Sequence, residues 1–203
     1  MRTTRRITYT ALFAALATVV MYFEMPLPFM PPFLKLDFSG AVILIAGFIF
    51  GPVSALLITL VKDLIHLLST QTGGVGELAD FIISSSLVVT ASVIYKWHRT
   101  KKGALIGCLS GAVLMVFAGV LANKFLLLPF YSQIMPFDAI ISACAAVNPM
   151  IANESTYLWF GVAPFNLIKS LLITLITFLL YKKLSFWIHA SCDIPAKSAN
   201  NKN

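Results

Sequence analysis

Charged side chains are scarce in this sequence of 203 residues: Asp, Glu, Lys and Arg together make up 11% of it. Soluble domains carry roughly 25% charged residues, so this scarcity excludes an ordinary soluble domain. Hydrophobic residues make up 59%, and the mean hydropathy is +0.88. These residues come in long blocks, and a helix of about 20 apolar residues is long enough to cross a bilayer. The sequence therefore predicts an all-α, polytopic membrane protein.

The motifs of common enzymes and nucleotide-binding proteins are also missing. The sequence has no Gly-x-x-x-x-Gly-Lys-Ser/Thr loop to hold phosphates, no Gly-x-Ser-x-Gly and no His-Glu-x-x-His. Its three cysteines, Cys108, Cys144 and Cys192, form no Cys-x-x-Cys pair, which argues against a disulfide framework or a zinc site. We therefore expect no catalysis, no metal and no cofactor. Any energy for transport must come from another protein.

Positive charge exceeds negative charge, with a formal net charge of +7. Helical membrane proteins concentrate Lys and Arg in their cytoplasmic loops, which accounts for this excess without a nucleic-acid partner. The protein is therefore expected to contact a lipid bilayer and not a nucleic acid.

Six apolar segments are predicted to form helices, at 7–23, 38–50, 52–70, 77–98, 103–128 and 157–184. The pair Gly51-Pro52 separates the second helix from the third, because Pro favours the first position of a helix. With this division the basic clusters at 96–102 and 182–183 lie on the same side of the membrane as the N-terminus. The positive-inside rule then places both termini in the cytoplasm. Residues 1–188 are predicted to form a six-helix transmembrane domain, and 189–203 a polar, disordered tail.

Ionisable groups inside apolar spans are costly and are therefore candidates for function. On the third predicted helix, Thr59, Lys62, Asp63 and His66 lie close together. Because neighbouring helical residues point about 100° apart, Lys62 and Asp63 need not pair with each other. Both an ion pair with another helix and a contact with a ligand remain open for this cluster.

A second polar cluster lies on the last predicted helix, where Asn166, Lys169, Ser170 and Thr174 form one stripe. Lys169 is about three turns from the outer end and has no acidic neighbour on its own helix. Its partner is either an acid from another helix or the carbonyl oxygens of a ligand. Asn123, on the fifth helix, can both donate and accept hydrogen bonds. Together these residues predict a cavity that is open to the outside and covered by the Pro-rich loop 26–38.

Several motifs, taken in order, resemble one family of membrane proteins, the riboflavin-specific S components (RibU family) of energy-coupling factor (ECF) transporters. The similarity extends from about residue 5 to residue 184. The motifs are Pro-Pro-Phe-Leu-Lys-Leu-Asp-Phe-Ser-Gly (31–40), Phe-Gly-Pro-Val (50–53), Leu-Val-Lys-Asp-Leu-Ile-His (60–66), Gly-Val-Gly-Glu-Leu-Ala-Asp-Phe (74–81), Asn-Lys-Phe-Leu-Leu-Leu-Pro-Phe-Tyr (123–131) and Pro-Phe-Asn-Leu-Ile-Lys (164–169).

This resemblance implies a multi-pass protein of the bacterial cell membrane that binds riboflavin from outside with high affinity. It also implies an energy-coupling module of one transmembrane T protein and two cytoplasmic ATPases. In the family, the residues matching Asn123 and Lys169 lie at the isoalloxazine ring, and an Ala-x-x-x-Ala motif matching Ala11 and Ala15 contacts the T protein. The substrate-binding residues expected from these motifs are Asn123, Lys169, Asn166, Phe33, Leu36, Phe38, Lys62 and Asp80.

Other functions remain open from the sequence. The chain could be an S component for a different vitamin, such as thiamine or biotin, or a stand-alone secondary transporter that uses Asp63 for proton coupling. A Ser/His pair between 84–86 and His66 would be needed for an intramembrane enzyme, and no motif supports one. Whether flavin mononucleotide is also accepted is not determined by the sequence.

Overall fold

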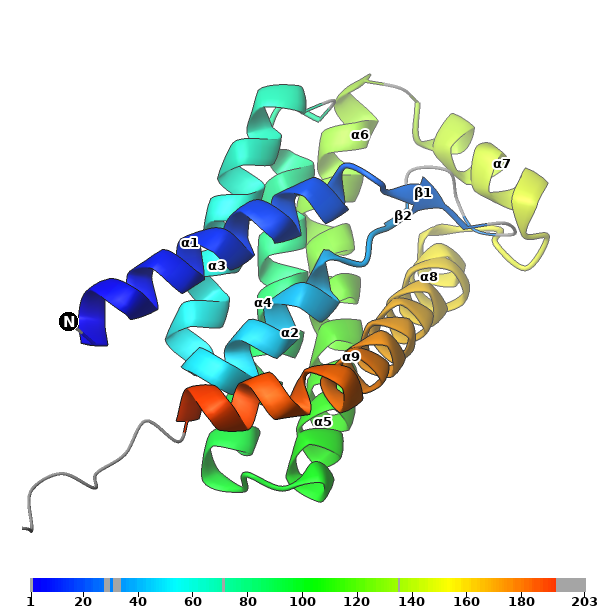
Figure 1. Ribbon diagram of the computed structural model, residues 1–203. Helices are drawn as coiled ribbons and strands as arrows, with labels where there is room; N and C mark the ends of the chain where they lie inside the picture. The colour runs from blue at the N-terminus through cyan, green and yellow to red at the C-terminus, as the bar shows by residue number, and fades with distance from the viewer. Residues whose placement is uncertain (1, 28–29, 31–33, 71, 135, 193–203) are drawn as a thin grey trace, which may run out of the picture.

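The computed structural model describes residues 2–192 except 28–29, 31–33, 71 and 135, and side chains within 4–180. The chain folds into a helical bundle with one short hairpin (Figure 1). The elements are α1 (Arg2–Met21), β1 (Met25–Pro26), β2 (Lys35–Leu36), α2 (Ser39–Phe50), α3 (Pro52–His66), the 3-10 helix η1 (Leu67–Ser69), α4 (Val75–Trp97), α5 (Lys101–Ala122), the π-helix η2 (Asn123–Leu127), α6 (Leu128–Ile134), α7 (Phe137–Val147), α8 (Glu154–Tyr157), the π-helix η3 (Leu158–Val162) and α9 (Ala163–Cys192).

Helix is present at each of the six ranges predicted from the sequence. The break between the second and third helices is confirmed. Gly51 has a φ of 92°, in the left-handed region that favours glycine, and Pro52 begins α3. The last helix runs to Cys192, eight residues beyond its predicted end, so the predicted tail begins in a helix. The rest of that tail lies outside the described residues.

Four helical stretches among the described residues are long and apolar enough to cross a membrane. They are Pro52–Ser69, Val75–Trp97, Lys101–Ile134 and Glu154–Leu180. The helix α2 (Ser39–Phe50) is apolar but shorter, and so is α7 (Phe137–Val147), which the sequence analysis did not predict. Large apolar side chains are exposed on all four long stretches, Leu56, Leu114 and Leu175 among them. In a bilayer such faces meet lipid tails.

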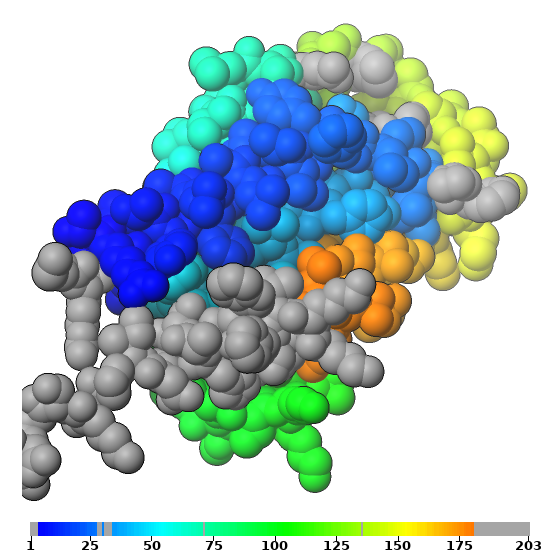
Figure 2. Space-filling model, in the orientation of Figure 1, coloured from blue at the N-terminus to red at the C-terminus, as the bar shows by residue number. Residues whose placement is uncertain are grey.

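The centre of the bundle is formed by α2, α4, α5 and α9 (Figure 1). On the face shown in Figure 2, α1 packs against α2 and α3. Small residues let α4 and α5 approach closely. A Cβ at Gly107 would lie 2.9 Å from the backbone oxygen of Ala91, and one at Gly111 would lie 2.7 Å from that of Leu87. These two glycines therefore serve packing inside the chain.

The hairpin β1–β2 lies at the end of the bundle that is remote from the turn between α4 and α5 (Figure 1). Met25 pairs with Leu36 and Pro26 with Lys35 in antiparallel register. A second apolar cluster joins this hairpin to α6, α7 and the start of α9, through residues such as Leu36, Ile140 and Phe165. The hairpin end is therefore a packed part of the fold, and the cavity described next lies beneath it.

Candidate functional site

A cavity of about 620 Å³ opens at the hairpin end of the bundle. This volume lies within the usual range of small-molecule sites. Its walls come from the ends of α1, α4 and α9, from the hairpin, and from η1, η2 and α6. The residues lining it are Met21, Tyr22, Glu24, Leu34, Lys35, Asp37, His66, Ser69, Thr72, Gly76, Glu77, Ala79, Asp80, Ile83, Asn123, Leu127, Tyr131, Phe165, Asn166 and Lys169.

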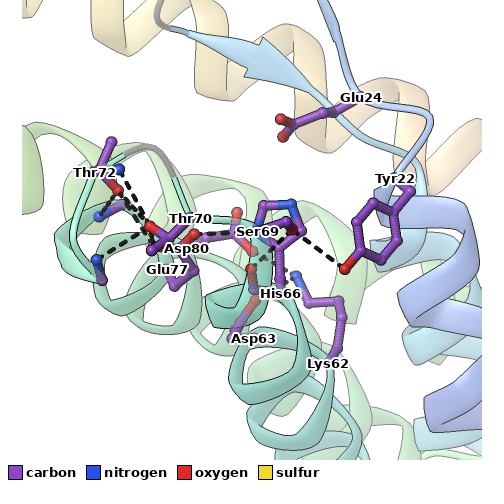
Figure 3. A network of polar contacts seen from close by, with 12 residues as sticks. Tyr22, Glu24, Lys62, Asp63, His66, Ser69, Thr70, Thr72, Glu77 and Asp80 are labelled. Atoms are coloured by element: carbon purple, nitrogen blue, oxygen red, sulfur yellow. Dashed lines mark hydrogen bonds and ion pairs between the residues drawn. The ribbon is translucent and has the colours of Figure 1, made fainter.

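A chain of buried ion pairs forms one side of the cavity. The Lys169 ammonium lies 2.7 Å from an Asp37 carboxylate oxygen and 3.1 Å from one of Asp80. The other Asp80 oxygen lies 2.6 Å from the ammonium of Lys62, which is also 2.8 Å from Asp63 (Figure 3). These five residues connect the hairpin, α3, α4 and α9. The sequence left open whether Lys169 pairs with an acid or with a ligand. In the structure two acids pair with it, Asp37 and Asp80.

Asp37 enters this chain because it lies between β2 and the first turn of α2. Its carboxylate accepts a hydrogen bond from the backbone N–H of Ser39 at 2.9 Å and another from the Ser39 hydroxyl. Burial alone would raise the pKa of Asp37, but the ammonium groups of Lys169 and Lys62, together with the hydrogen bond from Lys169, hold the pKa below its usual value. Asp37 is therefore held as a carboxylate that fastens the hairpin to α9.

Two carboxamides also line the cavity: Asn123 follows the end of α5, and Asn166 lies on α9, one turn before Lys169. Asn123 begins the π-helix η2, donates from Nδ2 to the Gly119 carbonyl at 2.9 Å and accepts from the Tyr157 hydroxyl at 2.8 Å. Asn166 donates from Nδ2 to the Val162 carbonyl at 3.0 Å. Segments of π-helix occur frequently at functional sites. Here η2 contains residues that line the cavity, and η3 precedes the lining residues of α9.

Gly119 makes the position of Asn166 possible. A Cβ on Gly119 would collide with the carboxamide of Asn166, whose side-chain atoms are the three nearest to that position. The absence of a side chain on α5 therefore leaves the space that the Asn166 carboxamide occupies beside the cavity.

Polar side chains form the rim of the cavity where α3 meets α4 (Figure 3). The Glu77 carboxylate is 3.1 Å from His66 Nδ1 and accepts hydrogen bonds from Thr70 at 2.9 Å and Thr72 at 3.3 Å. The Tyr22 ring packs against the His66 ring, with their centroids 5.4 Å apart. On the hairpin side, Glu24 and Lys35 form an ion pair of 2.5 Å. The cavity thus combines apolar walls with many hydrogen-bond acceptors. No group of three His, Cys, Asp or Glu residues suited to a metal ion occurs among the described residues.

Comparison with known proteins identifies the family. Residues 5–181 match the family described as ECF transporter, substrate-specific component. The chain belongs to this family of S components. The match covers most of the chain, including every element that lines the cavity, so the site lies within the region that this family shares.

Two similar proteins from bacteria carry the name of a riboflavin transporter. The S component is 33% identical over 185 residues to riboflavin transporter RibU of Staphylococcus aureus (strain TCH60), covering 91% of this chain and 93% of the relative. It is 27% identical over 187 residues to riboflavin transporter FmnP of Bacillus subtilis (strain 168), covering 91% and 94%. A solved structure titled "Structure and mechanism of the S component of a bacterial ECF transporter" matches with a TM-score of 0.74 and 31% identity, covering 92% of this chain and 98% of that one.

Four of the predicted binding residues of the S component line the cavity: Asn123, Asn166, Lys169 and Asp80. Three others do not line it. Leu36 and Phe38 pack in the apolar cluster beneath the hairpin, and Lys62 is buried behind Asp80. Phe33 lies outside the described residues. Lys62 and Asp63, which the spacing left free to pair or not, do form an ion pair.

Sequence analysis did not single out Asp37, Glu77 or Tyr157 as site residues, although each contributes to the cavity or supports it. A signal existed for Asp37, because an Asp side chain commonly accepts from the backbone N–H two residues further along, here that of Ser39. Glu77 lies in the first turn of α4, another favourable place for an acid.

Proposed function

We propose that this S component binds riboflavin in the cavity at the hairpin end and delivers it inward with an energy-coupling module of a T protein and two ATPases. The observation that carries this proposal is the pair of carboxamides, Asn123 and Asn166, on one wall of a cavity with apolar surfaces. The isoalloxazine ring is flat and apolar with an edge of carbonyl and N–H groups. A carboxamide donates and accepts at once and therefore complements such an edge. The names of the relatives support the same ligand.

The remaining polar groups suit the other end of this ligand. The ribityl chain is neutral and rich in hydroxyl groups, and each hydroxyl can donate to a carboxylate. Asp80, Glu77 and Glu24 all reach the cavity, and ionised carboxylates only accept hydrogen bonds. The cavity therefore offers acceptors where the tail needs them.

In this proposal six helices cross the cell membrane, both termini are cytoplasmic, and the cavity opens outward. The separation of charges supports this orientation, since Lys96, Arg99, Lys101 and Lys102 gather at the α4–α5 turn, at the end opposite the cavity. On α1, Ala11 and Ala15 are exposed while Ala14 and Ala17 are buried in the bundle. This smooth exposed stripe is the surface proposed to contact the T protein.

Titration of the purified S component with riboflavin, followed by quenching of flavin fluorescence, tests the proposal. We expect one site per chain, and Asn166→Ala should weaken binding by about three- to tenfold, because a net hydrogen bond contributes about 0.5–1.5 kcal/mol. Asn148→Ala is the matched control. Asn148 also donates to a backbone carbonyl, that of Phe160, but lies outside the cavity. An equal loss of affinity in both variants, or no loss in either, would argue against Asn166 as a ligand contact.

The substitution Gly119→Ala extends this test to the position of the carboxamide. Its Cβ forces Asn166 out of place, so the variant should lose about as much riboflavin affinity as Asn166→Ala. The double variant should lose no more than either single one, because the shorter side chain of Asn166→Ala leaves room for the new methyl group. Losses that add in the double variant would show that Gly119 acts independently of Asn166.

A further inference from the structure

We propose that this S component holds one anionic phospholipid on its membrane-facing surface. An acyl chain lies in an apolar groove between α5 and the start of α9, and the Lys124 ammonium binds the phosphate of the headgroup. The groove is separate from the cavity at the hairpin end, and the two share no lining residue.

The groove has a volume of about 370 Å³ and lies between α5 and the segment formed by η3 and α9. Its lining residues are Val113, Val116, Phe117, Trp159, Ala163, Pro164 and Leu167. None of these side chains is charged, and the indole N–H of Trp159 is their single hydrogen-bonding group. The half-buried Ala163 and Pro164 are small, so the larger Phe117 and Trp159 stand out beside them. The groove therefore suits a hydrocarbon chain.

Both walls of the groove belong to helices that are long and apolar enough to cross a membrane, Lys101–Ile134 and Glu154–Leu180. Phe117 and Trp159 are 57% and 60% exposed on them. Such a face meets lipid tails and not water. An acyl chain is therefore the occupant that the surroundings of this groove supply.

Lys124 lies at a depth that fits a headgroup. The start of α5, with Lys101 and Lys102, lies at the basic α4–α5 turn and marks one membrane surface. At 1.5 Å per residue, Lys124 lies about 33 Å further along the helix, and the hydrocarbon core is about 30 Å thick. The Lys124 ammonium is therefore level with the headgroups of the other leaflet, whereas Phe117 lies about 10 Å deeper in that leaflet.

Lys124 also lies on the face of α5 that forms the groove. Helical residues seven or eleven positions apart point in nearly the same direction, and Lys124 stands at these distances from Phe117 and Val113. On the other wall, the Tyr157 hydroxyl donates to Asn123 Oδ1 at 2.8 Å. This bond brings Trp159, two residues beyond Tyr157, to the same end of the groove as Lys124. Trp is common at that level of a membrane, where its ring lies among headgroups.

The Lys124 ammonium is available to an anion. Among the residues that the structure describes, no carboxylate forms an ion pair with it. It lies 5.8 Å from the centroid of the Phe125 ring, on the exposed surface. Basic residues at this level attract lipids with a net negative charge. The charge therefore favours an anionic phospholipid over a zwitterionic one of the same chain length.

Quenching of Trp159 fluorescence in mixed detergent micelles tests this proposal. The variant Trp97→Phe/Trp187→Phe of the full chain leaves Trp159 as its one tryptophan, and brominated acyl chains quench an indole that they touch. We expect brominated phosphatidylglycerol to give saturable quenching at about fivefold lower concentration than brominated phosphatidylcholine, since one basic residue near the headgroups contributes about that factor. Lys124→Gln should remove this preference. Ala163→Leu fills the groove and should abolish saturable quenching by either lipid.

Two controls match these variants. Lys96→Gln removes an exposed cation from the opposite end of the bundle, and Ala143→Leu adds the same side chain to an exposed alanine outside the groove. Both should leave the quenching and the preference unchanged. Native mass spectrometry of the full-length protein should show one retained phosphatidylglycerol per monomer.

The contrary outcomes are distinct. Equal quenching by the two lipids overturns the role of Lys124, and saturable quenching that survives Ala163→Leu overturns the groove as the site. A preference that Lys96→Gln removes assigns the anionic lipid to the α4–α5 turn instead. A dimer that Ala163→Leu dissociates would make a second copy of the chain the occupant. Lys124 is exposed, so its variant gives an answer even where Ala163→Leu fails to fold.

The result does not depend on the proposed function. None of the substituted residues lines the cavity at the hairpin end, so the variants should bind riboflavin as the unmodified protein does. A protein that retains the lipid without binding riboflavin would overturn the proposed function and leave this inference intact.

Discussion

Replacing Lys169 by Met is expected to lower the free energy of unfolding of the S component by about 3–5 kcal/mol. The Lys169 ammonium is the partner of Asp37 and one of two partners of Asp80, and all three side chains are largely buried. Its removal leaves Asp37 with an uncompensated buried charge. Unfolding in detergent, followed by circular dichroism, measures the change. Lys124→Met is the matched control, because Lys124 is exposed and its one contact of this kind among the described residues is a cation–π contact with Phe125, so its loss should be about 1 kcal/mol or less.

A second substitution shows whether the loss comes from the orphaned carboxylate. In Lys169→Met/Asp37→Asn the uncompensated charge is gone, so the double variant should be more stable than Lys169→Met alone. Losses that simply add would mean that Lys169 and Asp37 stabilise the fold independently, contrary to the 2.7 Å ion pair.

Replacing Lys62 by Met is expected to lower the free energy of unfolding by the same amount, about 3–5 kcal/mol. In this variant the carboxylate left without its partner is that of Asp63. Lys62 has no exposed surface, and its ammonium lies 2.8 Å from Asp63. Neither oxygen of Asp63 has a hydrogen-bond partner among the described residues, so this ion pair is its principal stabilisation. The same unfolding experiment in detergent measures the loss.

The combined change Lys62→Met/Asp63→Leu removes both charges of this pair and should regain a large part of the lost stability. Well-packed apolar replacements of buried ion pairs are often neutral or stabilising. A double variant as unstable as Lys62→Met alone would show that Lys62 stabilises the fold through its 2.6 Å contact with Asp80.

The sequence analysis placed Lys62 among the binding residues. Its position behind the wall of the cavity predicts that it acts on the ligand only through Asp80.

The sequence predicted the helices well because their signal is local. Long apolar runs mark the helices, and the Gly51-Pro52 pair marks a break that depends only on these two residues. The helix α7 was missed because a helix of eleven residues, with Asp138 in its first turn, is too short to suggest a span. The two π-helices were missed because a local widening of a helix depends on what packs against it, and neither η2 nor η3 has a distinctive composition.

The candidate site was predicted in part for the same reason. Asn123, Asn166 and Lys169 stood out as polar residues within apolar helices, and all three line the cavity. Asp37 did not stand out, because it lies in a loop where an acidic residue is unremarkable. Only the fold of the hairpin onto α9 brings it to Lys169. Pairing between distant segments is therefore what the sequence could not supply, and it identifies Asp37 and Asp80 as the partners of Lys169, in an ion-pair chain with Asp80 at its centre.

A crystal structure of the S component soaked or grown with riboflavin tests the central claim most directly. The account predicts the isoalloxazine ring inside the cavity, with a polar atom of its edge within about 3.2 Å of the Asn166 carboxamide and the chain from Asp37 to Asp63 still paired. A flavin bound elsewhere, or ion pairs rearranged so that the side chains of Asn166 and Lys169 close the cavity, would contradict it.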